Sequence, residues 1–460
     1  MTEHVTTPRT TAGAGDAAPR RSTFAAVLLL LLATLTVPVI VSGRGGTAEA
    51  FDQQRYHEPV IRAMAAQWPR VDLRDYNAAT TPGYHLLMAT AARYVTGNTI
   101  ALQLISSVLT ITLILVFYRQ MTAALPPAAA AAVVLPFLGS SYVLGAAIWL
   151  VTDNAALLFV VLTLGACVGA AWTTGRVVRG GVYAAIAVFV RQIHLWLAAP
   201  VALAAGAIGL GLAHRSATRK APLAAPAAMI AASLLPFAVL APFVILRDGL
   251  TPPMLADRHD AGVNPAVGPI SMALFGAFGV FFLPAFVDSR RHLLPRGARG
   301  WIVVAVVMLL AAAPPSSYDK TAGRWGGAIW ELVRLFPTIA DRSVVLPLLS
   351  GLGALVAVHA GRAAVAAGNG RRALILLVSM IGWMAAQAVS SIVFQKYCEP
   401  IVLLALAWLV VLGRPGREPG ASAKPESGSD RWWWGILGLG LIQIGLCGYT
   451  LYWPVWNAAP

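Results

Sequence analysis

The sequence contains little charge for its length. Only 12% of its 460 residues are charged, whereas 58% are hydrophobic, and the mean hydropathy is +0.71. This balance lies outside the range of soluble domains. The composition therefore excludes a soluble globular protein and indicates an integral membrane protein.

Cysteine is also scarce. The three cysteines, Cys167, Cys398 and Cys447, form no CxxC pair and no Cys/His spacing of the kind that binds zinc. Cys167 and Cys447 fall inside apolar runs. Disulfides and structural zinc are therefore not expected, and no motif in the sequence calls for a metal or another cofactor.

Long apolar stretches dominate the remaining sequence. Each is roughly 16 to 24 residues long, about enough to cross a hydrocarbon core of roughly 30 Å as a helix. Helices are expected because no backbone polar group can stay unpaired in lipid. The predicted fold is an all-α polytopic membrane protein with about 13 transmembrane helices. The expected spans are residues 22–43, 98–118, 127–149, 151–173, 180–198, 199–214, 223–246, 269–288, 300–315, 343–362, 373–391, 398–413 and 432–453.

The loops between these spans differ in charge. With the N-terminus in the cytoplasm, the cytoplasmic segments hold 20 of the 34 Lys and Arg residues but only 6 of the 19 acids. This bias follows the positive-inside rule, so the net charge of +15 reports orientation rather than nucleic-acid binding. The C-terminus is then extracytoplasmic, and the acids are concentrated on the outer face.

The topology divides the chain into a core and its appendages. A transmembrane catalytic domain is expected over residues 22–413, with a final helix and a short outer tail over 432–460. The first outer loop contains "QQRYHEPVIRAMAAQW", whose apolar positions have helical spacing and predict a helix lying in the membrane interface. The expected outer loops are 44–97, 247–268 and 316–342, and the expected disordered cytosolic segments are 1–21 and 414–431.

Two groups of ionisable residues occur within or beside predicted spans. Asp153, in "WLVTDNAALLF", is either a helix-boundary residue with Thr152 as the N-cap or an acid in a cavity open to the outside. Arg191 and His194, in "VFVRQIHLWLA", lie three positions apart and hence on one helical face. Arg191 either forms a structural ion pair with Asp153 or binds a lipid phosphate together with His194.

Other polar residues fall on the same outer side. The run "MLADRHDAG" is either a solvated turn or part of a site, and "FQKYCEP" is either an interfacial anchor or a site segment just outside a helix that begins near Pro400. One outward-facing cavity would account for all of these residues, and it would suit an anionic lipid and a polar acceptor. Its expected members are Asp52, His57, Asp75, Asp153, Arg191, His194, Asp257, His259, Lys396 and Glu399.

The order of these motifs resembles a known family. It is similar to the GT-C class of polytopic glycosyltransferases that use polyprenyl-phosphate sugars, most closely to the dolichyl-phosphate-glucose α-1,2-glucosyltransferase family. That family's acidic, His-containing first loop and Thr-Thr-Pro-Gly-Tyr-like turn resemble "FDQQRYHEPV" followed by "QWPRVDLRDYNAATTPGYH". Its later motifs resemble, in the same order, "VTDNAALLF", "FVRQIHLW", "LADRHD" and "QKYCEP".

The chain departs from the family pattern in two places. The family's Asp-Glu pair aligns on Gln53 and Gln54, with Asp52 one residue further from the His-containing element. His194 stands where the family has Asn. The Ala-, Pro- and Arg-rich composition suggests a bacterial genome of high GC content, and hence a polyprenyl carrier and a multi-pass protein of the plasma membrane.

The resemblance implies an inverting transfer of a hexose, with glucose expected. The sugar would move from a polyprenyl-phosphate donor to a glycan or lipid-linked acceptor on the extracytoplasmic side, without a cofactor or an obligatory metal. A carboxylate in the first outer loop would act as the base. The expected catalytic acids are Asp75, Asp52 and Asp153; the expected ligands of the donor phosphate are Arg191, His194, Arg258 and Lys396; and the expected contacts to the acceptor or sugar are His57, Glu58, Gln192, Asp257, His259 and Glu399.

Two other functions fit parts of the pattern. A transporter or flippase for lipid-linked sugars or small solutes could also use intramembrane Arg and Asp, and a non-catalytic membrane scaffold is the third alternative. The stretch "YNAATTPGYH" is expected to be a turn in which Pro82 fixes φ, Gly83 permits positive φ and the threonines cap a helix from His85 to Tyr94. Its expected task is to hold Asp75 over the lipid phosphate.

Overall fold

The computed structural model describes residues 17–74, 76–169, 172–211, 224–252, 255, 262–287, 297–414 and 431–457. Nearly all of this part of the chain is helical, which confirms the predicted all-α class. The elements are α1 (Ala17–Ser42), α2 (Ala48–Asp52), η1 (Gln53–His57), α3 (Glu58–Gln67), α4 (Gly83–Tyr94), α5 (Thr99–Met121), α6 (Pro127–Leu138), α7 (Ser141–Ile148), α8 (Asp153–Cys167), α9 (Thr174–Val190), η2 (Gln192–Leu197), α10 (Ala198–Gly209), α11 (Ala224–Arg247), α13 (Val267–Phe286), α14 (Ala298–Ala312), α15 (Ala328–Arg334), β1 (Thr338–Ile339), β2 (Arg342–Ser343), α16 (Val345–Ala366), α17 (Gly370–Ala388), α18 (Gln395–Leu412), α19 (Trp434–Cys447), η3 (Gly448–Tyr452) and α20 (Trp453–Asn457).

The protein is a multi-pass membrane protein. Eight helices within the described ranges are long and apolar enough to cross a bilayer, and α6 with α7 adds a ninth if this pair, bent by 74°, is one span. Each of the 13 expected spans coincides with helix, but several of these helices are short or broken. The described spanning helices are therefore fewer than the apolar runs of the sequence.

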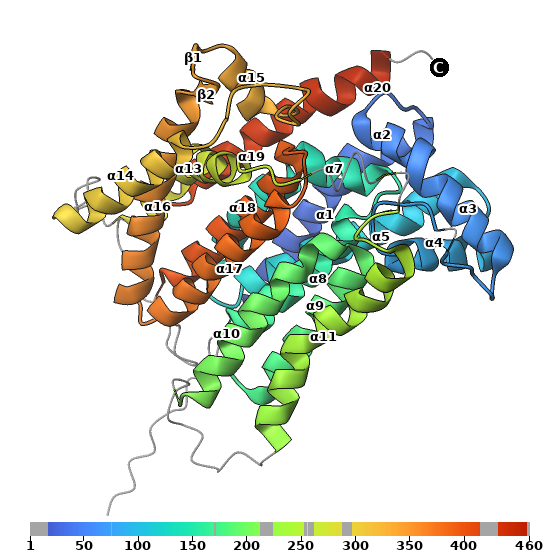
Figure 1. Ribbon diagram of the computed structural model, residues 1–460, viewed down its shortest axis with the longest axis horizontal. Helices are drawn as coiled ribbons and strands as arrows, with labels where there is room; N and C mark the ends of the chain where they lie inside the picture. The colour runs from blue at the N-terminus through green and yellow to red at the C-terminus, as the bar shows by residue number, and fades with distance from the viewer. Residues whose placement is uncertain are drawn as a thin grey trace, which may run out of the picture.

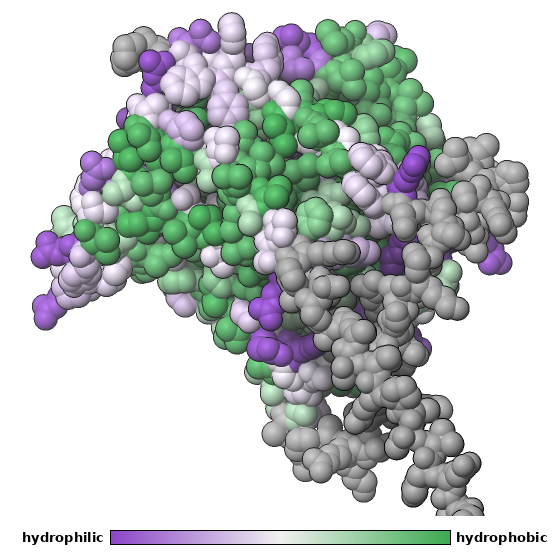
Figure 2. All heavy atoms as spheres, turned by 180° about the vertical axis from the view of Figure 1, so that it is seen from behind, coloured by the Kyte–Doolittle hydropathy of each residue, from purple (hydrophilic) through white to green (hydrophobic). Residues whose placement is uncertain are grey.

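Hydrophobic side chains cover much of the outside of the bundle. Figure 2 shows them as a broad green band, with hydrophilic residues gathered at the top and at the lower edges. Exposed members on different helices include Leu30, Val108, Leu309, Ile381 and Leu441. In water such a surface would be strongly unfavourable, whereas in a bilayer the lipid tails cover it.

The first outer segment forms a small helical layer beside the bundle. It contains α2, η1, α3 and α4, drawn in blue at one side of Figure 1, and η1 is a π-helical turn. The apolar face of α3, expected to lie in the membrane interface, buries Ile61 and Met64 completely or nearly so. Ile61 packs in a cluster with Tyr84 and Met88 of α4, so this side of α3 faces protein.

The "YNAATTPGYH" stretch docks onto the end of α9. The hydroxyl of Thr81 donates a hydrogen bond to the carbonyl of Val188 at 2.6 Å, and its backbone N–H donates to Oε1 of Gln192 at 3.1 Å. Thr81 therefore ties two segments that are about a hundred residues apart, and it does not cap α4. The helix itself begins at Gly83, two residues earlier than expected, and its N-cap residue Pro82 has no side chain that could cap it.

Gly83 is required for a reason other than the expected one. The φ angle of Gly83 is not positive, so the prediction of a left-handed turn residue was wrong. A Cβ at this position would lie 2.6 Å from Cδ1 of Phe189 and 2.7 Å from its carbonyl oxygen. Glycine is needed because the start of α4 lies directly against the backbone of α9.

The helix expected over residues 180–198 is interrupted. α9 ends at Val190, Arg191 is extended with φ −156° and ψ 112°, and the chain continues as the 3₁₀ helix η2. The break turns the Gln192 side chain toward the first outer segment, where its amide accepts from Thr81 and donates to the carbonyl of Ala79. A regular helix was predicted because the surrounding residues are apolar, whereas these polar contacts favour the break.

Candidate active site

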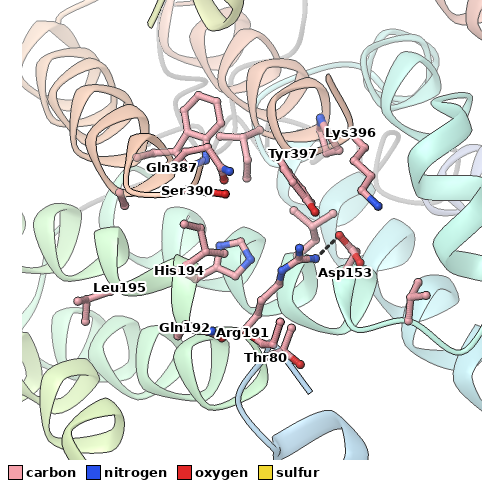
Figure 3. A pocket seen from close by; sticks show the side chains of 18 of the residues that line it. Thr80, Asp153, Arg191, Gln192, His194, Leu195, Gln387, Ser390, Lys396 and Tyr397 are labelled. Carbon is pink, nitrogen blue, oxygen red and sulfur yellow. Dashed lines mark hydrogen bonds and ion pairs between the residues drawn. The ribbon is translucent and has the colours of Figure 1, made fainter. Parts of the chain in front are cut away.

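Two adjoining cavities lie between the first outer segment, α8, the α9–η2 junction and α18. The first has a volume of about 280 Å³ and the second about 430 Å³. Figure 3 shows the lining side chains of a pocket that contains Asp153, Arg191 and Lys396. The residues that line both cavities are Glu49, Asp52, Ala79, Thr80, Tyr142, Asp153, Arg191, Lys396 and Tyr397.

The charged residues at this junction come from four separate elements. α2 supplies Asp52, and the first residue of α8 is Asp153, where the helix N-terminus favours a negative charge. Arg191 occupies the break before η2, and Lys396 lies in the first turn of α18. The sequence predicted that these four residues share one site, and the fold brings them together.

Each cation is paired with an acid. Arg191 forms an ion pair with Asp153, drawn as a dashed line in Figure 3, and Nζ of Lys396 lies 3.1 Å from Oδ2 of Asp52. The ring of Tyr397 lies 5.3 Å from the guanidinium carbon of Arg191 and 5.4 Å from Nζ of Lys396, close enough for cation–π attraction. Pairing matters here because an uncompensated charge in such a site would be strongly destabilising.

Glu49 is an acid of this site that the sequence analysis missed. It precedes Asp52 by three residues on α2, so both carboxylates share one helical face. Burial raises the pKa of the Glu49 carboxyl above its ordinary value, although the charge of Lys396 opposes this shift. The i, i+3 spacing in "AEAFD" was the available signal, but Glu49 lay outside the motifs that the resemblance covered.

The two cavities differ away from their common residues. The first is lined by aliphatic side chains from η2, α11 and neighbouring segments, which include Ile193, Leu195, Leu240, Leu250 and Val389. The second is lined by aromatic side chains, which include Phe51, Tyr56, Trp325 and Phe394. A charged junction therefore separates an aliphatic compartment from an aromatic one.

Three further predicted residues lie beside these cavities. His57 lines the second cavity, and His194 and Gln192 line the first. His194 is buried, and its Nδ1 has no hydrogen-bond partner within the described part of the chain. Gln192 anchors the turn through Thr81 and Ala79, so part of its side chain is already committed to structure.

Two predicted contact residues line neither cavity. Glu58 accepts hydrogen bonds from Gln53, Arg62 and Thr99, and although its partial burial alone would raise the carboxyl pKa, these bonds lower that pKa below the ordinary value. These bonds tie α3 to α5, so the expected contact of Glu58 with the acceptor or sugar finds no support in the lining of either cavity.

Glu399 likewise lies elsewhere than expected. α18 begins at Gln395 rather than near Pro400, so Glu399 lies inside the helix and is buried. Its carboxylate accepts hydrogen bonds from Ser140 at 2.7 Å and from Gln395 at 2.6 Å, with a third from Gln443. The start was predicted near Pro400 because the apolar run begins there. The helix itself extends five residues further toward the N-terminus, through residues that are mostly polar.

Four predicted site residues lie outside the described residues. They are Asp75, Asp257, Arg258 and His259. Their proposed roles stay predictions.

Comparisons with known proteins add little to this geometry. No protein-family model and no curated protein matches the chain. Among solved structures, the apo form of ArnT from Cupriavidus metallidurans is similar, with 14% sequence identity and a TM-score of 0.35 over 87% of this chain and 78% of that one. A TM-score this low carries no argument about function, so the function has to be argued from the site itself.

Proposed function

We propose that the protein is a membrane glycosyltransferase of the GT-C type. It transfers a sugar from a polyprenyl-phosphate donor to a hydroxyl acceptor on the extracytoplasmic side. The observation that carries the proposal is the shared junction, where acids of the first outer segment meet Arg191 and Lys396 between an aliphatic and an aromatic cavity. The order of the sequence motifs supports the same assignment.

The donor occupies the aliphatic cavity. Side chains of η2 and α11 there suit the isoprenoid part of a lipid, whose tail continues into the bilayer. The phosphate lies at the junction, where Arg191 and Lys396 bind it as a fork and a point charge. Tyr397, which lies near both cations, keeps them on the same side of the site.

Asp52 is the proposed base. It stands one residue further from His57 than the acid of the family that the sequence resembles. The turn between them, η1, is π-helical, and a π-turn closes its hydrogen bond over one more residue than an α-turn. The extra residue is thus absorbed locally, which leaves Asp52 at the cavity junction. Glu49, one helical turn earlier on α2, lines both cavities beside Asp52.

Donor binding activates the base. Without donor, Asp52 is paired with Lys396 and Asp153 with Arg191. The donor phosphate competes for both cations and releases the carboxylates. The acceptor oxygen then attacks the anomeric carbon, and the bond between that carbon and the phosphate oxygen breaks. The acceptor proton passes to Asp52. The products are the glycoside and the polyprenyl phosphate.

The finer assignments extend this proposal. The aromatic cavity accommodates the acceptor, a glycan or a lipid-linked sugar, because flat rings offer apolar faces to sugar rings. The transferred sugar is a hexose, with glucose first, and the linkage inverts at the anomeric carbon. The protein lies in a bacterial plasma membrane with a cytoplasmic N-terminus, and Asp75 assists from the first outer segment.

The test uses membranes that contain the full-length protein. Radiolabelled polyprenyl-phosphate glucose and mannose are supplied, and label in glycan or lipid-linked product is measured. Asp52→Asn should reduce transfer at least 100-fold, because loss of a base typically costs a factor of about 10²–10⁴. Glu58→Gln is the matched control, since Glu58 lies in the same segment outside both cavities.

Other outcomes of this assay assign the function elsewhere. Full activity of Asp52→Asn with loss in Asp75→Asn or Glu49→Gln moves the base to that residue. Label that crosses the membrane without being transferred supports the transporter. If the folded protein neither transfers the sugar of either donor nor transports either donor, the proposal is overturned.

A further inference from the structure

A chain of hydrogen bonds leads from the aromatic cavity into the protein and has no role in the mechanism above. Nδ1 of His57 lies 2.9 Å from Nε2 of His85, and Nδ1 of His85 lies 2.7 Å from the hydroxyl of Tyr76. The Tyr76 hydroxyl lies 3.1 Å from the carbonyl oxygen of Thr81. His85, Tyr76 and Thr81 are buried, whereas His57 lines the cavity.

The direction of every bond in this chain follows from its last member. A carbonyl oxygen can only accept, so the Tyr76 hydroxyl donates its single proton to Thr81. The tyrosine oxygen must then accept from Nδ1 of His85, which leaves Nε2 of His85 as an acceptor. Nδ1 of His57 supplies that proton. This is the assignment that makes all three hydrogen bonds, and buried polar groups are rarely left unpaired.

Both histidines are neutral in this arrangement. Burial lowers the pKa of His57 to about 4, and burial also lowers the pKa of His85 well below its ordinary value. A neutral imidazole has one N–H, and the hydrogen bond to His85 places that proton of His57 on Nδ1. Nε2 of His57 therefore carries a lone pair.

We infer that His57 Nε2 is a fixed hydrogen-bond acceptor that recognises a hydroxyl group of the sugar acceptor. The same cavity presents the carboxylates of Glu49, Asp52 and Asp153, while the proposed function assigns the cations Arg191 and Lys396 to the donor phosphate. Acceptors at these positions suit a ligand that offers hydroxyl donors, as a sugar does. His85 and Tyr76 are positioning residues, because they hold the tautomer without lining either cavity.

The local geometry supports this assignment. His57 is the last residue of the π-helical turn, five residues after Asp52, and a π-turn brings residues with that separation onto one side. The planes of the His57 and His85 rings lie within 22° of each other with centroids 5.1 Å apart, as expected for two rings joined edge to edge by the hydrogen bond between them. The identity of the ligand rests on the proposed function, whereas the tautomer does not.

The tautomer is measured first, without any substrate. The full-length protein, labelled with ¹⁵N-histidine and reconstituted in lipid, is examined by NMR, and the His57 and His85 signals are assigned by loss in His57→Gln and His85→Gln. The expected spectrum has protonated Nδ1 and bare Nε2 for both residues. A proton on Nε2 of His57 overturns the inference.

The positioning role is tested by removing the Tyr76 hydroxyl. Tyr76→Phe should give His85 and His57 mixed tautomers and raise KM for the acceptor about tenfold while changing kcat less than twofold. Tyr84→Phe is the matched control, because its hydroxyl bonds to Ser106 and not to the chain, and it should keep the wild-type tautomers. Unchanged tautomers in Tyr76→Phe contradict the inference.

The ligand class is tested with two small probes. Methyl α-D-glucopyranoside should shift the ¹⁵N signal of His57 Nε2, whereas inorganic phosphate should not. A shift with phosphate alone, or no shift with the glucoside at its solubility limit, overturns the hydroxyl assignment. Expected tautomers and glucoside shift together with no sugar transfer would instead refute the proposed glycosyltransferase while the histidine chain stands.

Discussion

α18 carries two charged residues, one turn apart, whose surroundings differ completely. Lys396 faces the cavity junction, pairs with Asp52 and lies near an aromatic ring. Glu399 is buried and is held by three hydrogen-bond donors, from Ser140, Gln395 and Gln443. Both were predicted from sequence to belong to one outer site, but only Lys396 does.

The difference shows which buried charges are available for function. Both oxygens of Glu399 accept hydrogen bonds and the residue lines neither of the two cavities, so it joins α18 to the start of α7 and to α19. At the junction, by contrast, Asp52 and Asp153 line both cavities beside their paired cations. A buried charge in a membrane protein indicates a functional site when open volume lies beside it, and otherwise it indicates packing.

The largest effect should come from removing a cation of the junction. Arg191→Gln should lower sugar transfer by a factor of about 10²–10³, comparable to the loss of one donor that stabilises a developing charge. Melting temperature should also fall, because Asp153 loses its ion-pair partner, so transfer is compared per folded molecule. Arg93→Gln, an exposed arginine on α4, is the control and should transfer normally. Equal activity of both variants would remove Arg191 from the phosphate site.

The opposite pattern is expected at Glu399. Glu399→Gln replaces an acceptor with a group that also donates, so one donor of Gln395 or Gln443 loses its partner at a cost of about 1–3 kcal/mol. The melting temperature in detergent should fall, while transfer per folded molecule should stay within twofold of wild type. Loss of turnover with unchanged melting would place Glu399 in the chemistry and erase the contrast.

Gly83→Ala tests the docking of the turn. The added methyl would overlap the Phe189 side chain and carbonyl, and overpacking of this kind costs about 1–3 kcal/mol. Activity should fall as well, because α4 and the preceding turn carry His85 and Thr81. Gly97→Ala is the control, since the nearest atom to its Cβ would be 3.8 Å away. Thermal melting and transfer rate of the two variants decide the matter.

The smallest effect concerns pH. Burial lowers the pKa of His57 to about 4 from an ordinary value of 6.5. Between these values an unfolded chain binds a proton at His57 more readily than the folded one. The contribution of the neutral His57 to the free energy of unfolding is therefore complete above pH 6.5 and is lost as the pH falls toward 4. His57→Gln should flatten the rise of melting temperature with pH in this window by a few degrees. A slope identical to wild type would mean that His57 is protonated in the folded state.

The sequence indicated several charged residues of the site but not all of them. Asp52, Asp153, Arg191 and Lys396 could be predicted because a charge beside an apolar run has few explanations. Glu49 could not, since an acid in an outer loop is ordinary until α2 is seen to face the junction. Asp75 remains a prediction outside the described residues.

The polytopic helical class was determined by the sequence alone, because lipid leaves the backbone of a long apolar run no alternative to the helix. Only the tertiary structure decided where those helices break and which polar side chains meet. Arg191 leaves the helical path where Gln192 binds the turn of the first outer segment, and Glu399 turns into the protein interior while Lys396 does not. Hydropathy is a property of each residue, whereas these outcomes depend on hydrogen-bond partners far away in the chain.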